Sequence, residues 1–305
     1  MSTVEPIRIF AGCDPNDCDL EQMMVFEHSA RKRASMPLEF HWMRLSRDPR
    51  SPWYSDDGPP HHGWDTRQWA TPFSGFRWAV PQACGFTGRA LYMDTDMVVL
   101  GDLAELWKTS LGPTAVCAAR RQTLDFPRFC VMLWDCARAK AVLPDGETLR
   151  ADPGSHARLR EAFGRHPAWV QAMDPAFNAI DGEHLPPERI KVLHYSDMGT
   201  QFSHPHALPR LAREGRTHWF DGEILPHPRA DLTAIFEAEL AEALAAGRRL
   251  DDYRNPSPYG LFAKKSERTH QGNPVTRPRR RFRLFSRFRA PAGPPGVART
   301  PHLKR

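Results

Sequence analysis

The chain of 305 residues is long enough to bury one large core or two small ones. Hydrophobic residues make up 41% of it, with 9 Trp and 17 Phe, which is typical of a globular protein. No apolar run approaches the roughly 18 residues of a membrane-spanning helix, and no basic segment followed by an apolar one opens the sequence. We therefore expect no secretory signal and a cytoplasmic location.

The net charge of +6 is unevenly distributed. After residue 260 there are 13 Lys and Arg residues against one acidic residue, so the preceding part is mildly acidic. We predict a folded domain over residues 1–250 and a basic, Pro- and Arg-rich tail over 251–305 that is largely disordered.

Part of this tail has the composition of a weak membrane-surface binder. Wound as a helix, residues 279–289 place three Phe among arginines. This favours peripheral contact with the inner face of a membrane, while a solvated tail without a specific partner is an equal alternative. No nucleic-acid recognition fold accompanies the tail, so we expect no specific nucleic-acid partner.

Six cysteines form neither a CxxC pair nor a zinc-finger spacing. Several lie in apolar runs, as Cys130 does, where a buried free thiol is usual. We predict that all six are structural; they are Cys13, Cys18, Cys84, Cys117, Cys130 and Cys136.

The first 45 residues predict a strand, a helix and a second strand. The strands are expected at 7–11 and 38–45, with a loop at 12–17 and a helix over 19–33. This βαβ unit implies parallel pairing.

A Pro- and Gly-rich stretch follows over residues 46–71, longer than most loops in compact domains. Its aromatic residues either stack on a sugar or base or cap the core; they are Trp53, Tyr54, Trp64 and Trp69. Residues 72–84 have helical apolar spacing with Arg77 in the middle, and Gly85 ends the helix.

The remaining elements alternate in the same way, which predicts an α/β domain of the nucleotide-binding kind. In the last helix we expect Asp231 as N-cap and Gly247 just after the C-terminus. Strands are expected at 114–119, 129–135 and 190–195, and helices at 153–165 and 232–246.

The stretch from Arg89 to Trp107 is central to the function. It predicts a strand ending on Asp94 and Asp96, an apolar run, a turn at Gly101 and a helix from near residue 102. Because strand side chains alternate, the two carboxylates can face the same way while the residue between them does not. Paired carboxylates at a strand end suit a hard divalent cation.

With these residues in view, the chain resembles the retaining glycosyltransferases of family 8, which have a GT-A fold. This resemblance implies a Rossmann-like mixed sheet flanked by helices. Four stretches carry it: Ile9 to Asp14, Phe73 to Pro81, Arg89 to Trp107, and His194 to Asp197.

What the resemblance implies is a nucleotide-sugar donor, most often UDP-linked, with Mn²⁺ or Mg²⁺ bridging its phosphates. The metal ligands would be Asp94, Asp96 and His194, the two aspartates being the catalytic pair. Ala11, Gly12 and Asp14 would line the nucleotide pocket, with Arg77 near the base or phosphates.

The sequence also departs from the family pattern. Around Gln201, which we expect near the cofactor, it lacks the family's lysine, so phosphate neutralisation would rest on the metal, Arg77 and Lys191. Where the family has a turn before a strand, this chain has Pro127 to Cys130. In the stretch that corresponds to the family's acidic acceptor-side run, Asp174 is the only acidic residue, and we take it as a third candidate catalytic residue.

We therefore predict a metal-dependent transferase that moves a hexose, with retention, to an unidentified glycan, lipid or protein acceptor. Two alternatives stay open. The first is a catalytically diverged binding protein with the same fold. The second is a phosphatase of the haloacid dehalogenase kind, in which the first Asp of the pair is a nucleophile; its pattern normally continues with Gly-Thr, whereas Met97 and Val98 follow here.

Overall fold

A computed structural model describes residues 5–56, 58, 60–120, 127–183 and 185–260. All of them belong to the first of two compact units, residues 1–273. The predicted tail from residue 261 onward, with its aromatic and arginine-rich segment, lies outside the described residues. None of the described helices is long and apolar enough to cross a bilayer.

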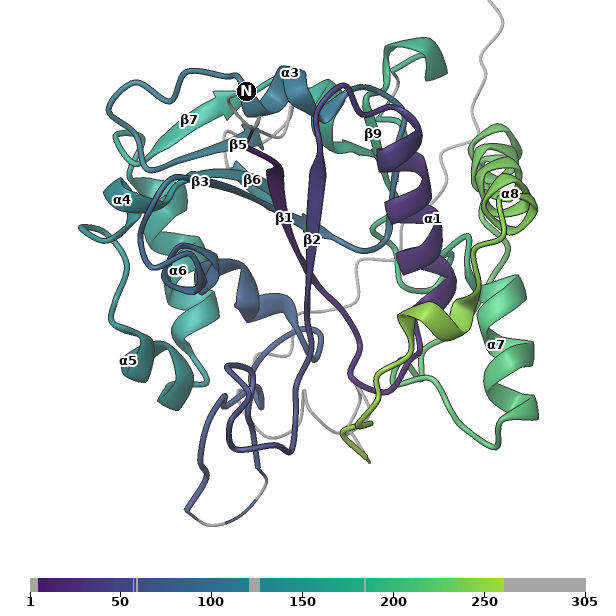
Figure 1. The fold of residues 1–305 in the computed structure, drawn as a ribbon, viewed down its shortest axis with the longest axis horizontal. Coiled ribbons are helices and arrows are strands. Elements are labelled where there is room, and N and C mark those ends of the chain that lie inside the picture. The colour runs from purple at the N-terminus through teal and green to yellow at the C-terminus, as the bar shows by residue number, and fades with distance from the viewer. Residues whose placement is uncertain (1–4, 57, 59, 121–126, 184, 261–305) are drawn as a thin grey trace, which may run out of the picture. The chain divides into compact units, whose positions relative to one another are not determined.

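The centre of the fold is a mixed six-stranded sheet in the order β2-β1-β3-β6-β5-β7 (Figure 1). β1 pairs in parallel with β2 and β3, β5 pairs in parallel with β7, and β6 is antiparallel to both of its neighbours. The predicted βαβ unit and α/β class are thus confirmed. The strands are β1 (Ile7–Gly12), β2 (Leu38–Met43), β3 (Arg89–Asp94), β5 (Val116–Arg120), β6 (Pro127–Asp135) and β7 (Val170–Met173).

After Asp94 the chain enters a second, three-stranded sheet, in which the strand order is β4-β9-β8. The chain bends at Thr95 and Asp96, so the apolar run expected after the carboxylates is a separate strand, antiparallel to β9. The helix expected near Asp102 is confirmed, with the Asp102 side chain accepting a hydrogen bond from the Ala104 N–H. The strands are β4 (Met97–Val99), β8 (Ala179–Ile180) and β9 (Val192–His194).

The helices expected at 19–33, 153–165 and 232–246 are confirmed within a few residues. The α-helices are α1 (Leu20–Lys32), α2 (Val80–Ala83), α3 (Leu103–Trp107), α4 (Cys136–Ala139), α5 (Gly146–Ala151), α6 (Ser155–Arg165), α7 (His204–Arg213) and α8 (Ala230–Ala245). Four 3₁₀-helices complete the described elements: η1 (Ser74–Trp78), η2 (Pro175–Asn178), η3 (Pro187–Arg189) and η4 (Leu250–Tyr253).

Two local predictions about helices are wrong. Residues 72–84 form the 3₁₀-helix η1 followed by the short α2, because Pro81 has no N–H to continue a helix through this point. Asp231 is not the N-cap of α8: that position is Arg229, with which Asp231 forms an ion pair. Gly247 does follow the helix with a φ of 80°, as expected.

Helices cover both faces of the large sheet (Figure 1). α1 and α8 lie beside each other on one side, and α4, α5 and α6 lie on the other. Alternation along β3 sends Tyr92 to the side of α6 and Leu91 and Met93 to the side of α1. Asp94 lies two residues after Tyr92, on the same face of β3, at the end of the strand.

The three tryptophans of the loop 46–71 cap the core, whereas the Tyr54 hydroxyl donates a hydrogen bond to Asp56. Trp64 and Trp69 are buried and pack with Phe76 of η1, and Trp53 packs partly buried against the same group. Gly75 is needed here because a Cβ atom would lie 2.2 Å from the Trp69 ring. These three indoles are therefore used in packing.

The folded domain extends past the boundary expected after residue 250. Tyr253 packs on Trp42, and Tyr259 donates a hydrogen bond to the Ser55 hydroxyl; both tyrosines are buried. Two buried aromatic side chains hold this stretch on the domain although its composition resembles the tail.

Candidate active site

Strand ends bring the candidate residues together. Asp94 ends β3 and lies opposite Gly12 of β1. β6 runs antiparallel beside β3 and carries Cys130, and β9 ends on His194. Polar side chains from both sheets therefore meet where β1 and β3 end.

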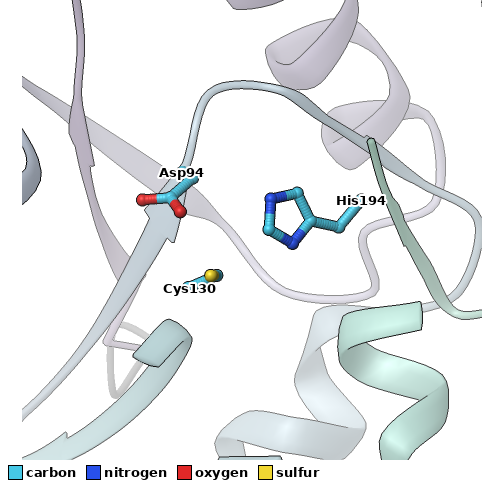
Figure 2. A group of neighbouring side chains, drawn as sticks. All are labelled: Asp94, Cys130 and His194. Atoms are coloured by element: carbon cyan, nitrogen blue, oxygen red, sulfur yellow. The ribbon is translucent and has the colours of Figure 1, made fainter. Parts of the chain in front are cut away.

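Three side chains at this place form a compact group of ligand atoms. One atom each from Asp94, Cys130 and His194 lies within 4.8 Å of the other two (Figure 2). Asp96 does not belong to this group, but its Oδ1 is 3.3 Å from His194 Nε2. The predicted ligands Asp94, Asp96 and His194 are thus neighbours, with a thiol added.

Cys130 was not among the site residues predicted from the sequence. Its apolar neighbours predicted a buried structural thiol. That prediction agrees with the other five cysteines, which are buried, whereas Cys130 is only partly buried. The departure from the family pattern over 127–130 was the available signal, because Cys130 lies within β6 beside the end of β3.

The imidazole of His194 is held from one side by an amide. Its Nδ1 is 3.0 Å from Asn178 Oδ1, an arrangement in which Nδ1–H donates and Nε2 faces Asp96. The ring is 2% exposed. Burial lowers the pKa of His194, but the nearby Asp96 carboxylate and Cys130 together outweigh burial and raise the pKa well above its ordinary value.

Asp96 is positioned by an amide relay from α1. Gln201 Nε2 donates to Asp96 Oδ2 at 3.1 Å, and Gln22 donates to the Gln201 carbonyl. Gln201 was expected to contact the cofactor, and in the structure its amide nitrogen contacts this carboxylate. Asp96 Oδ1 is buried and has no well-aligned hydrogen bond, and its nearest charged partner is the His194 ring at 3.3 Å.

Asp94 is fixed by two donors. Arg77 contacts its Oδ1 at 3.1 Å, and the Tyr92 hydroxyl donates to the same oxygen at 2.5 Å. Arg77 also donates to the carbonyls of Ser74 and Phe129. The guanidinium that we expected near the base or phosphates is thus buried against a metal-ligand candidate.

The predicted nucleotide-pocket residues lie on β1 and just after it. Ala11 is fully buried, and a Cβ atom on Gly12 would lie 3.2 Å from the Phe73 carbonyl oxygen. Asp14 is buried and its Oδ1 accepts from the backbone N–H groups of Asn16 and Cys18. Its carboxylate therefore organises the loop that follows β1.

A second buried acid, Asp19, lies beside that loop. Its Oδ2 accepts from the Asp14 backbone N–H at 2.9 Å and from the Thr95 hydroxyl at 3.4 Å. Burial and the neighbouring Asp14 carboxylate raise the pKa of Asp19 to about 8, against the opposing influence of Arg44. The folded protein therefore holds a proton at this pair at neutral pH.

This proton makes stability depend on pH. Because the folded pKa of Asp19 exceeds its unfolded value of 3.8, its contribution to stability is complete below that value and declines as the pH rises through about 8. We expect Asp19→Asn to flatten this decline, so that the variant gains stability over the wild type at alkaline pH. Urea unfolding midpoints at several pH values test this. Asp48→Asn, which removes an exposed carboxylate, is the matched control, and an unchanged slope in Asp19→Asn would contradict the prediction.

The structure places two other expected residues away from this group. Asp174 is exposed and caps η2 by accepting from the Ala176 N–H at 3.0 Å. Lys191 forms an ion pair with Glu105 and lies 4.8 Å above the Phe177 ring. Among the contacts of the described residues, none joins either side chain to Asp94, Asp96 or His194.

This arrangement fits a divalent cation. Carboxylate, imidazole and thiol groups are all metal ligands, and a ligating His commonly donates its other N–H to a fixed acceptor, as His194 does to Asn178. The buried Asp96 Oδ1, which faces the His194 ring and has no well-aligned hydrogen bond, is a further anionic atom for which a cation would compensate. The ligands Asp94, Cys130 and His194 would hold the ion, with Asp96 beside them.

Comparisons with known proteins give distant structural likenesses. No protein-family model and no curated protein sequence matches the chain. A galactosyltransferase LgtC in complex with donor and acceptor sugar analogs is 13% identical, with a TM-score of 0.49, over 77% of this chain and 96% of its own.

Two further structures have similar scores. The glycosyltransferase GlyE of Streptococcus pneumoniae TIGR4 is 14% identical with a TM-score of 0.48, over 85% of this chain and 67% of its own. The bifunctional glycosyltransferase WbbM is 12% identical with a TM-score of 0.46, over 63% of this chain and 46% of its own. Since these TM-scores lie below 0.5, a function for this chain has to be argued from its own residues.

Proposed function

We propose that this protein is a metal-dependent glycosyltransferase that moves a hexose from a nucleotide sugar to an acceptor. The observation that carries the proposal is the convergence of Asp94, Asp96 and His194 where the central strands end. The resemblance of the sequence adds a UDP-linked donor, retention of configuration, and Mn²⁺ or Mg²⁺ as the cation.

The chemical need for such a site comes from the leaving group. A nucleoside diphosphate gains negative charge as the bond to the sugar breaks, and a divalent cation bound here would neutralise that charge as a Lewis acid. This cation requires ligands that keep their places while the substrate changes. Burial and hydrogen bonds to fixed partners provide that preorganisation.

Each of the three converging side chains is held by neighbouring residues. Arg77 and Tyr92 hold Asp94, Gln201 holds Asp96, and Asn178 holds His194. Such outer partners typically contribute 10- to 100-fold to metal affinity or activity. Arg77 also places a permanent positive charge beside the candidate cation site, where it favours anionic substrates.

The class of acceptor molecule and the residues that would contact it are proposed from the sequence resemblance alone. A glycan, lipid or protein acceptor is compatible with it, and Asp174 stays a candidate catalytic residue there. Peripheral attachment of a cytoplasmic enzyme to the inner face of a membrane through the basic tail also belongs to this proposal.

Release of UDP from a panel of UDP-sugars tests the function, with and without a chelator, and first without an acceptor. We expect metal-dependent hydrolysis of one sugar, because water replaces the acceptor slowly. Phosphate release from the same panel and from phosphomonoesters is the control for a phosphatase. No release and no UDP binding under any metal condition would overturn the proposal in favour of a diverged binding protein.

A further inference from the structure

The thiol of Cys130 changes the chemistry of the candidate metal site. Thiolate ligands favour Zn²⁺ and similar soft or borderline cations, whereas Mn²⁺ and Mg²⁺ are bound through carboxylates, carbonyls and water. For a given site, affinity also rises from Mn²⁺ toward Co²⁺ and is high for Zn²⁺. A site with one thiol, one imidazole and carboxylates is therefore poorly matched to Mn²⁺.

The position of the thiol makes it a ligand candidate. The Cys130 sulfur, a His194 ring nitrogen and an Asp94 oxygen lie within 4.8 Å of one another, and the three side chains come from separate strands (Figure 2). Bonds from Zn²⁺ to such ligands are about 2.0–2.3 Å long. One ion in contact with all three requires the side chains to rotate toward it.

The charges around the group agree with a bound thiolate. With Cys130 ionised, the site contains that thiolate and the carboxylates of Asp94 and Asp96. The buried guanidinium of Arg77, 3.1 Å from Asp94, offsets one of these charges. A divalent cation balances the other two, provided that His194 binds it as a neutral imidazole.

We propose that this site binds a thiophilic divalent cation, Zn²⁺ or Co²⁺, in preference to Mn²⁺, with Asp94, Cys130 and His194 as protein ligands. Three protein ligands with a further position left open are typical of catalytic zinc sites. The inference replaces Mn²⁺ or Mg²⁺ as the cation of the proposed function. It rests on that function for the role of the ion, because the open position would take an oxygen of the donor's diphosphate.

Titration of the full-length, metal-free protein with Co²⁺ tests the ligand set without any activity measurement. We expect one equivalent to produce a sulfur-to-cobalt charge-transfer absorption, which Zn²⁺ removes and an equal concentration of Mn²⁺ does not. The band should be absent in Cys130→Ser and retained in Cys84→Ser, a matched change at a cysteine outside the group. Zn²⁺ affinity in Cys130→Ser should fall by at least the roughly 10- to 100-fold that follows loss of an outer partner.

A second measurement needs only the wild type, in case Cys130→Ser fails to fold. Among the six cysteines only Cys130 is partly exposed, so alkylation under native conditions should label it first. Zn²⁺ should protect it from labelling, and Mn²⁺ at the same concentration should not. Bound Co²⁺ without the absorption band, or equal protection by both cations, would overturn the inference.

These outcomes are separate from those of the proposed function. Co²⁺ bound through Cys130 together with silence across the UDP-sugar panel would reject the transferase and leave the metal assignment intact. Transfer supported by Mn²⁺ in a protein whose Cys130 shows no metal contact would reject the metal assignment and leave the transferase.

Discussion

Asp96→Asn is expected to reduce sugar transfer by on the order of 10²–10³-fold while the fold is kept. The amide retains an oxygen at the place where Asp96 Oδ1 lies 3.3 Å from His194, but it removes the charge that a cation needs. The loss should appear in kcat, since the cation acts on charge that develops as the bond breaks. Steady-state kinetics with the donor found in the UDP-sugar panel measures it.

The same substitution has an electrostatic signature. Without the Asp96 carboxylate, Cys130 is the remaining neighbour that raises the pKa of His194 against the effect of burial, so this pKa should fall from its strongly raised value. Titration of the His194 ring by NMR in the metal-free protein measures this change. Asp102→Asn is the control, because Asp102 caps α3 and Asn caps helices equally well. Wild-type turnover in Asp96→Asn would remove this residue from the site.

Arg77→Met is expected to lower the free energy of unfolding by about 3–5 kcal/mol, which is the usual cost of removing one partner of a buried ion pair. Arg77 and Asp94 have side chains that are 10% and 14% exposed, so Asp94 would be left charged and largely unhydrated. The carbonyl oxygens of Ser74 and Phe129 would also lose their Arg77 donors. Urea denaturation at neutral pH measures the change.

A double variant separates the two causes of this loss. Adding Asp94→Asn to Arg77→Met removes the uncompensated charge, so part of the lost stability should return. Arg165→Met is the matched control, because Arg165 pairs with Glu161 and the two side chains are 74% and 57% exposed; such surface pairs contribute about 0–1 kcal/mol. A cost for Arg77→Met no larger than that of Arg165→Met would contradict the buried pair.

The sequence by itself determined many of the strands of the α/β domain and its helices α1, α3, α6 and α8, because these depend on local patterns. Apolar alternation placed β1, β3 and β6, and the apolar stripe placed α8. Local signals failed where a distant contact decided the outcome. The indoles of the loop 46–71 could have faced a ligand, and only the position of Phe76 made them part of the core.

For the site, the sequence identified Asp94, Asp96 and His194 as candidates, because the Asp-x-Asp motif and the family pattern can both be recognised without the structure. Only the tertiary structure decided which side chains support them. Arg77 is 17 residues from Asp94, and Gln201 is 105 residues from Asp96. No pattern in a single sequence encodes such pairings, because they arise where strands from two sheets meet.

The clearest case is Cys130. Its sequence neighbours are apolar, so the sequence determined that it belongs to a strand next to the core. Only the tertiary structure decided that its sulfur lies beside Asp94 and His194, because β6 runs antiparallel to β3 and β9 closes the other side. The residue type was visible in the sequence, whereas the chemistry of the thiol depends on neighbours that only the folded chain brings to it.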